Sequence, residues 1–133
     1  MKRLKVLSLS LLLLMCVPLV MAGCASDKTI DCVLGQDSQE VKITNKAVNF
    51  KIDLQSETNL SWSVTLRGDG GVVSTGYLEI QFRDSQGTVL QTGLSIPSPN
   101  NIPAGTYFLR IKVRDEYSNR YGFVRVRFSD RNA

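Results

Sequence analysis

Five basic side chains are the residues whose spacing best suits binding chemistry. In residues 107–113 and 124–128, apolar positions alternate with cations, so the cations should share the solvent-facing side of two strands. If these strands pair through a hairpin at residues 115–120, the cations form one patch suited to an acidic protein or an anionic surface polymer. A purely protective role at strand edges is the alternative. The cations are Arg110, Lys112, Arg114, Arg125 and Arg127.

Two tyrosines near the tip of that predicted hairpin are candidates for stacking on a carbohydrate. They are Tyr117 and Tyr121, whose rings combine an apolar face with a polar hydroxyl. Trp62 falls on the inward side of its strand by alternation, so we expect it in the core rather than in a sugar-binding platform.

The sequence contains no histidine, which removes most familiar catalytic arrangements. Ser-His-Asp and Cys-His nucleophilic sites and the histidine metal motifs are excluded together. Asp115 and Glu116 are adjacent, but in a loop their carboxylates should point apart, which does not suit paired acid–base catalysis. The sequence therefore predicts a protein that is not an enzyme and that has no metal ion or cofactor.

Residues 67–71, Arg-Gly-Asp-Gly-Gly, are rich in glycine but lack the spacing of a phosphate-binding loop. We expect a flexible turn here. The first three residues also spell the tripeptide that integrin ligands display on exposed loops, which makes host-cell adhesion an alternative interpretation.

The amino-terminal residues carry an export signal. Three cations precede an apolar run over residues 6–20, which is shorter than a membrane-spanning helix requires. Residues 21–24, Met-Ala-Gly-Cys, then resemble the lipobox of bacterial lipoproteins, in which small residues precede an acylated cysteine. The resemblance implies a signal peptide over residues 1–23 and a lipid on Cys24. An ordinary secretory signal, giving a soluble product, is the alternative.

The residue after this cysteine bears on location. In Gram-negative lipoproteins an Asp at this position retains the protein at the inner membrane, and Ala25 occupies it here. The resemblance therefore implies the outer membrane, with the bilayer as a partner through the lipid. A cysteine with three acyl chains exceeds the two signals that stable anchoring needs.

Processing would change the charge of the protein. Cleavage leaves 133 − 23 = 110 residues with 16 − 3 = 13 basic and 12 acidic side chains. The mature protein is nearly neutral, so nucleic acid is not an expected partner. Cys32 is left without a partner in the chain, and we expect a small buried hydrophobic residue there, with an intermolecular bridge or reactive thiol as the alternative.

The rest of the sequence predicts strands, because apolar residues recur with period two in runs bounded by Gly, Asn, Asp, Ser and Pro. We expect an all-β, antiparallel β-sandwich, jelly-roll or Ig-like, with about seven to eight strands over residues 41–133. Residues 24–40 should form the lipidated amino terminus and a short tether, with at most one edge strand. The inward residues of the clearest runs are Val48, Phe50, Ile52 and Leu54; Leu60, Trp62, Val64 and Leu66; Leu78, Ile80 and Phe82; Tyr107, Leu109, Ile111 and Val113; and Val124, Val126 and Phe128.

Two connections have clear signals. Residues 84–87, Asp-Ser-Gln-Gly, predict a short hairpin with Gly87 at positive φ. Residues 96–103 contain three prolines, which remove hydrogen-bond donors and exclude a central strand. This segment should be a crossing loop or an edge.

Residues 77–90 and 102–111 resemble the bacterial pre-peptidase C-terminal type of domain. In that family a strand, a D-x-x-G hairpin and a later P-x-G-T-Y strand recur in this order, and here they are residues 84–87 and 103–107. The resemblance implies a jelly-roll-like β-sandwich of the kind found beside secreted hydrolases. It implies no activity, because no catalytic neighbour accompanies it here.

Together these features predict an outer-membrane-anchored lipoprotein that acts as a non-catalytic binding or assembly module in the bacterial envelope. We expect it to contact an envelope or secretion complex, through an acidic envelope protein or a surface polymer. A carbohydrate-binding or cell-surface-polymer-binding lipoprotein, similar to an adhesin, is the alternative.

Overall fold

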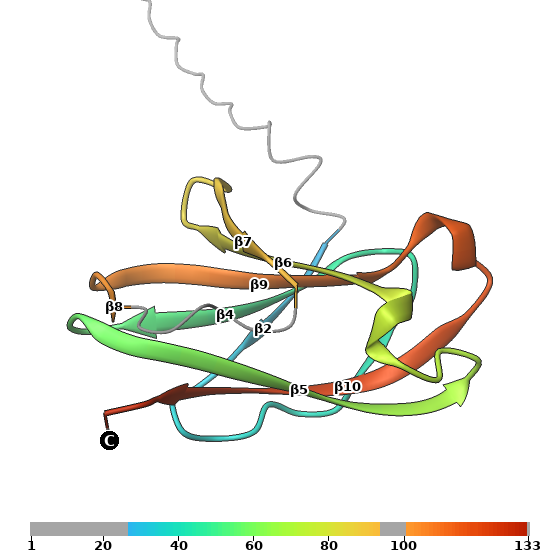
Figure 1. The fold of residues 1–133 in the computed structure, drawn as a ribbon, viewed down its shortest axis with the longest axis horizontal. Helices are drawn as coiled ribbons and strands as arrows, with labels where there is room; N and C mark the ends of the chain where they lie inside the picture. Colours follow the sequence, from blue (N-terminus) through green and yellow to red (C-terminus); the bar gives the residue numbers. More distant parts are fainter. Residues whose placement is uncertain (1–26, 94–100, 133) are drawn as a thin grey trace, which may run out of the picture.

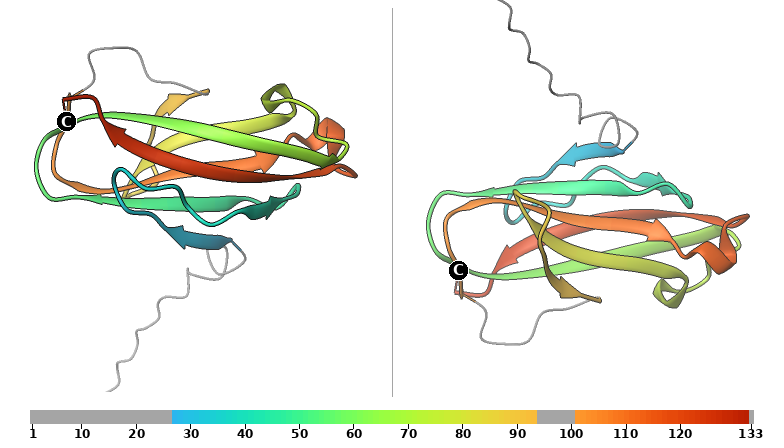
Figure 2. Two further views of the ribbon diagram at one scale, coloured as in Figure 1. Left: turned by 90° about the horizontal axis from the view of Figure 1, so that it is seen from below. Right: turned by 90° about the horizontal axis from the view of Figure 1, so that it is seen from above.

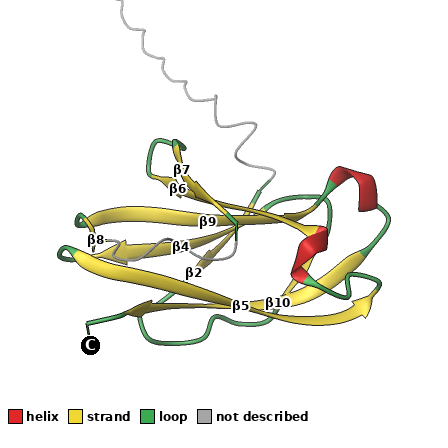
Figure 3. Cartoon of the chain, viewed as in Figure 1, coloured by secondary structure: helices red, strands yellow, loops and turns green. Residues whose placement is uncertain are grey.

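The computed structural model describes residues 27–93 and 101–132, so Cys24 and the predicted signal peptide lie outside the described residues. Nine strands form two stacked sheets (Figure 1), and the only helical elements in these ranges are two short 3-10 turns (Figure 3). The prediction of an all-β sandwich is confirmed. Within the same ranges, no helix is long and apolar enough to cross a membrane.

One sheet has five strands in the order β2-β4-β9-β6-β7, and the other has four in the order β3-β10-β5-β8. The elements along the chain are β2 (Lys28–Asp31), β3 (Val41–Ile43), β4 (Val48–Leu54), β5 (Thr58–Gly70), η2 (Thr75–Tyr77), β6 (Leu78–Asp84), β7 (Val89–Thr92), β8 (Asn101–Ile102), β9 (Gly105–Val113), η3 (Asp115–Tyr117) and β10 (Tyr121–Asp130).

The two sheets lie one over the other (Figure 2). The predicted inward residues form the core between them. Phe50, Leu109 and Phe128 are completely buried. Their polar neighbours along each strand face solvent, as period-two alternation requires. Val64 and Leu66, also predicted to be inward, are only partly buried.

An aromatic stack joins the two sheets. Trp62 of β5 stacks on Phe82 of β6 with ring centroids 4.7 Å apart, and Phe82 stacks on Tyr107 of β9 at 5.5 Å. Trp62 is buried, so its predicted place in the core is confirmed. Its indole Nε1 has no hydrogen-bond partner among the described residues.

The prediction that the last two long strands form a hairpin was wrong. β9 pairs with β4 and β6, whereas β10 pairs with β3 and β5 in the other sheet. The turn η3 carries the chain from one sheet to the other. Asn45 holds the start of this crossing, because its Nδ2 donates to the Val113 carbonyl and to Asp115 Oδ1, both at 2.9 Å.

Only β6 and β7 are consecutive strands of one sheet, and every other successive pair of described strands changes sheet. Their hairpin follows the prediction. Asp84 Oδ1 accepts hydrogen bonds from the backbone N–H groups of Gln86 and Thr88, both at 2.9 Å, and Gly87 has a φ of 83°. Of the proline-rich segment, residues 94–100 lie outside the described residues, and β8 is a two-residue edge strand.

The segment expected to be a tether packs on the sandwich from residue 27 onward. β2 pairs with β4 in parallel, an exception to the antiparallel arrangement, and Ile30 enters the core. The next residues lie along β10, where the N–H groups of Gly35 and Ser38 donate to the carbonyls of Phe128 and Val126 at 2.7 and 2.8 Å.

Residues 67–71 are not the flexible turn predicted from their glycines, because β5 continues to Gly70. A Cβ atom on Gly68 would lie 2.3 Å from the Val72 carbonyl oxygen, and one on Gly70 would lie 2.4 Å from the Tyr121 carbonyl oxygen. These glycines permit close approach of neighbouring backbone. The Arg-Gly-Asp tripeptide therefore lies in a strand and not on a displayed loop.

Candidate binding surfaces

The sandwich divides the seven candidate ligand-binding residues among three places. Arg110 and Lys112 lie on the outer face of the five-stranded sheet. Arg114 and Tyr117 lie around the crossing between β9 and β10. Tyr121, Arg125 and Arg127 lie on the outer face of the four-stranded sheet. The single patch of five cations is therefore not formed, because it depended on pairing between β9 and β10.

On the five-stranded sheet, the cations are close to carboxylates of the same chain. Arg110, with 22% of its side chain exposed, lies 3.8 Å from both Asp27 and Glu79. Lys112 forms a 2.9 Å ion pair with Asp115. These two cations, placed on adjacent outward positions of β9, form a compensated network, which weakens their case as an anion-binding site.

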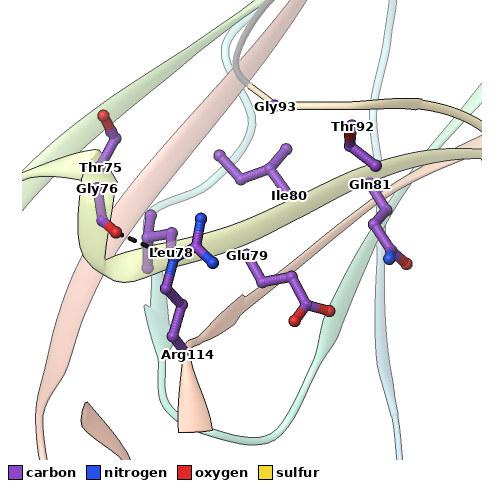
Figure 4. Close-up of a pocket in the computed structure, with 9 residues that line it drawn as sticks. All are labelled: Thr75, Gly76, Leu78, Glu79, Ile80, Gln81, Thr92, Gly93 and Arg114. Carbon is purple, nitrogen blue, oxygen red and sulfur yellow. Dashed lines mark hydrogen bonds between the residues drawn. The ribbon is translucent and has the colours of Figure 1, made fainter. Parts of the chain in front are cut away.

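Arg114 lies beside a cavity of about 580 Å³ at the end of β7 (Figure 4). Its Nε donates to the Gly76 carbonyl at 3.1 Å, which fixes the side chain against the turn η2. Among the described residues that line this cavity, Glu79 is the one carboxylate, and none of them is a cysteine.

Tyr117 is engaged by other side chains of the chain. Its ring meets Tyr77 edge-on with centroids 4.4 Å apart, and the Arg120 guanidinium lies over both rings, 5.0 Å from Tyr77 and 5.5 Å from Tyr117. Arg120 Nη1 also donates to the Gly71 carbonyl at 3.3 Å. This cluster ties together the loops that join β5 to β6 and β9 to β10, which leaves Tyr117 poorly placed to stack on a sugar.

The outer face of the four-stranded sheet is the best candidate binding surface. We define the β10 face by the outward residues of β10 and their cross-strand neighbours. In the strand register, Phe123 is opposite Lys42 on one side and Arg67 on the other, while Arg125 is opposite Thr65. The members of the β10 face are Lys42, Ser63, Thr65, Arg67, Tyr121, Phe123, Arg125 and Arg127.

On the β10 face, two cations from neighbouring strands lie over the two aromatic rings of β10. The Arg67 guanidinium lies over the Phe123 ring at 4.3 Å, and the Lys42 ammonium lies over the Tyr121 ring at the same distance. The two rings meet edge-on with centroids 5.8 Å apart. Tyr121 remains 37% exposed, so it is open to a partner on its remaining side.

Arg67 is a fixed part of this surface. It forms a 2.9 Å ion pair with Glu40 and a second ion pair with Asp69. The hydrogen bond from Arg67 is the main reason why the pKa of Glu40 is below its usual value, and the charges of Arg67 and Arg125 add to this effect. Arg67 therefore orients Phe123 and is already neutralised by its own chain.

Arg125 and Arg127 are the exposed arginines of β10. Arg127 forms an ion pair with Asp37 at 3.6 Å, with both side chains about half exposed, so Arg125 is the more available of the two to a partner. Sequence reasoning selected these two residues and Tyr121, but missed Lys42 and Arg67, whose proximity depends on strand register. The cavities of about 580, 370 and 320 Å³ are lined by other residues. A broad exposed surface of this kind suits a macromolecule better than a small ligand.

Neither face carries a metal centre, since the described residues contain no group of three or more potential metal ligands. Among the described residues, Cys32 forms no disulfide and is only half-buried, so the small buried hydrophobic residue predicted there is found in part. Burial, with a smaller contribution from Asp31, raises the pKa of the Cys32 thiol to about 11.

The raised pKa of Cys32 predicts that its thiol reacts slowly with alkylating agents. Because the thiolate is the reactive form, alkylation of Cys32 by iodoacetamide at pH 8 should be about 100-fold slower in the folded protein than in urea, where the pKa returns to its ordinary range. The folded-state rate should keep rising with pH until about pH 11. Mass spectrometry of timed samples measures both rates. Equal rates in the folded and unfolded protein would show that Cys32 is an ordinary reactive thiol.

No protein-family model matches this sequence, and no curated protein matches it. Solved structures that share its fold include the following two. The pre-peptidase C-terminal domain of collagenase from Bacillus anthracis is 14% identical, with a TM-score of 0.52 over 77% of this chain and 93% of that chain. The periplasmic lysozyme inhibitor of g-type lysozyme from Aeromonas hydrophila, PliG, is 5% identical, with a TM-score of 0.53 over 77% of this chain and 97% of that chain. The fold of the first structure supports the resemblance carried by residues 77–90 and 102–111.

Proposed function

We propose that this chain is a lipid-anchored envelope protein that binds another protein through the β10 face and catalyses no reaction. The observation that carries the proposal is the contrast between the two sheets. Arg110 and Lys112 are held by carboxylates of their own chain, whereas Arg125 is exposed on the same sheet face as the partly exposed ring of Tyr121. Exposed arginine and tyrosine are typical of residues that anchor protein interfaces.

The anchoring part of the proposal rests on the lipobox-like residues 21–24, and Ala25 favours the outer membrane. The binding part gains support from the fold, because PliG, a periplasmic inhibitor of g-type lysozyme, is built on a similar sandwich. The exposed cations predict a partner with an acidic surface. An anionic surface polymer is the second candidate, favoured by the Lys42 ammonium that lies over the partly exposed ring of Tyr121.

A photo-reactive amino acid at position 65 tests the location of the site. Thr65 is exposed opposite Arg125, so irradiation of intact cells should give one adduct of defined mass. The matched control is position 53, because Asp53 is exposed on the outer face of the other sheet. Mass spectrometry of the adduct distinguishes a protein from a polymer. Equal adducts from both positions, or none from position 65, would overturn the proposed site.

Charge reversal tests the cations. The pair Arg125→Glu and Arg127→Glu should weaken adduct formation at position 65 by at least about tenfold, because like charges would then face the acidic partner. The matched control is Lys28→Glu with Lys46→Glu, which changes the net charge equally at two exposed positions outside the β10 face. Equal loss in both pairs would assign the effect to net charge, and no loss in either would remove the arginines from the site.

A further inference from the structure

Asp27 is held on the outer face of the five-stranded sheet. The Asn49 Nδ2 donates to Asp27 Oδ2 at 3.4 Å, and the Arg110 Nε lies 3.8 Å from the same oxygen. Asn49 and Arg110 are opposite each other on β4 and β9, at outward positions of the two strands. The β10 face belongs to the other sheet and therefore lies on the opposite side of the sandwich.

Asp27 is only three residues along the chain from Cys24, the predicted site of the lipid. Three residues span at most about 11 Å when fully extended. Stacked sheets are about 10 Å apart, and a layer of side chains covers the outer side of each, so the surface of the β10 face is farther from Asp27 than this segment can reach. A lipid on Cys24 would therefore keep the five-stranded sheet beside the bilayer and the β10 face away from it.

The β6–β7 hairpin lies on the same side of the molecule as Asp27. Both border one hollow of about 320 Å³, which is lined by Asp27 and Thr29 from the start of β2 and by residues 84–87 from the hairpin turn. The start of β2 and the hairpin both rise on the side of the five-stranded sheet that faces away from β5 and β10 (Figure 1). A membrane held beside Asp27 would therefore also be close to this hairpin.

The strand that follows the hairpin turn exposes aliphatic side chains. Val89 is 41% exposed and Leu90 is 45% exposed, and among the large hydrophobic residues exposed in the described ranges they are the one pair adjacent in sequence. Residues 85–93 contain no charged side chain. Transfer of aliphatic groups from water to the apolar part of a bilayer is favourable, whereas a nearby charge would oppose it. β7 (Val89–Thr92) can therefore contact lipid without burying a charge.

The outer face of the five-stranded sheet is close to electrical balance. Anionic lipid headgroups should therefore neither attract it nor repel it strongly. The short segment to Cys24 and the aliphatic side chains of β7 are left to determine how the domain lies on the bilayer. The cations of this face are Lys51, Arg83, Arg110 and Lys112, and the carboxylates are those of Asp27, Asp31, Asp53 and Glu79.

We propose that the outer face of the five-stranded sheet lies on the membrane surface, with Val89 and Leu90 in contact with lipid, and that the β10 face points away from the bilayer. The inference rests on the lipid anchor of the proposed function and adds an orientation to it. A protein partner would then reach the β10 face from the side away from the membrane. The partner of this second surface is the phospholipid bilayer itself.

Fluorescence quenching in vesicles tests the orientation. The full-length precursor is expressed with Cys32→Ser and one added cysteine for a fluorophore, and its membrane-bound product is reconstituted in phospholipid vesicles whose headgroups carry a nitroxide quencher. Ser85→Cys labels the β6–β7 turn, and Ser63→Cys, the same substitution at an exposed position of the β10 face, is the matched control. Quenching should be at least about threefold stronger at position 85, because the sandwich holds position 63 at least about 10 Å farther from the bilayer.

A pair of double variants tests the contact of β7 with lipid. Val89→Thr with Leu90→Thr, added to Ser85→Cys, should lower the quenching at least about twofold, because polar side chains would replace two aliphatic groups that the lipid covers. Val33→Thr with Val73→Thr is the matched control, since both valines are exposed outside β7, and it should leave the quenching unchanged.

The outcomes separate the orientation from the anchor. Loss of the protein from the vesicles during flotation would show that no lipid is attached and would overturn both. If the protein stays on the vesicles, quenching at position 63 that equals or exceeds quenching at position 85 would overturn the orientation alone. Equal effects of the two double variants would remove Val89 and Leu90 from the membrane contact and contradict the proposal as stated.

Discussion

A chain carrying Cys24→Ala should have no acyl chains and should not be retained by the outer membrane. In the class of lipoproteins that residues 21–24 resemble, the cysteine thiol receives the lipid before cleavage, so the variant should also keep residues 1–23. Each buried methylene contributes about 0.8 kcal/mol to membrane binding, and three acyl chains make release negligible. A polybasic anchor is not expected to replace the lipid, because residues 24–133 contain 13 basic and 12 acidic side chains.

Metabolic labelling with an alkyne fatty acid and the mass of the amino-terminal peptide measure the expected changes. An uncut apolar leader could hold the variant at the membrane, so a second chain needs an ordinary secretory leader in place of residues 1–23, together with Cys24→Ala. This chain should be fully released from membranes by a buffer wash. Acyl label on the Cys24→Ala chain, or membrane retention of the second chain, would contradict lipid anchoring.

Replacing Phe82 with Ala should destabilise the sandwich by about 3–5 kcal/mol. Phe82 is almost completely buried and stacks on Trp62 of the opposite sheet and on Tyr107 of its own sheet. Its loss leaves a cavity and removes two aromatic contacts at once. A domain of this size has a total free energy of unfolding of about 5–15 kcal/mol, so the variant should be partly unfolded at growth temperature.

The loss of unfolding free energy is measured by urea unfolding, followed by circular dichroism, of the chain with the secretory leader and Cys24→Ala. Trp62 is the only tryptophan, so its fluorescence reports the same transition next to the altered site. Phe108→Ala is the matched control, because Phe108 is the same residue type on the outward side of β9. It should cost at most about 1 kcal/mol. Similar losses in the two variants would show that Phe82 does not hold the sheets together.

Periodicity predicted the strands well because burial depends on alternation within each strand. Trp62 and Phe82 both faced inward in the sequence pattern, and each is buried in the structure. The hairpin at residues 84–87 was also predictable, since Asp84 and Gly87 have specific roles in a tight turn. These features depend on neighbours only a few residues away.

Strand partners could not be predicted in the same way. Residues 115–120 have the polar composition of a hairpin loop, but they cross between the sheets, and nothing local distinguishes these two outcomes. The alternation of apolar and polar residues predicts that Arg110 and Arg125 face solvent. It does not predict to which of the two sheets each strand belongs. The predicted patch failed for this reason. Lys42 and Arg67 were missed because they reach the β10 face only through long-range register.

The prediction of a flexible turn at residues 67–71 was wrong because it relied on the glycines alone. A cluster of glycines commonly marks a turn, but a strand also needs glycine where another part of the backbone approaches closely. The atoms that approach Gly68 and Gly70 belong to Val72 and Tyr121, and the second of these comes from β10. The sequence does not show that approach until the pairing of β5 with β10 is known.

The alternation of successive strands between the sheets also affects when the domain can fold. β10 is the last described strand along the chain, yet it is a central strand of the four-stranded sheet, and it brings Val124 opposite Val41. Only the β6–β7 hairpin can form from neighbouring residues, and contacts between distant residues slow folding. The sandwich therefore cannot be completed before residues 121–130 have been made. We expect the growing precursor to remain unfolded throughout its synthesis, in a state that can still be threaded across a membrane.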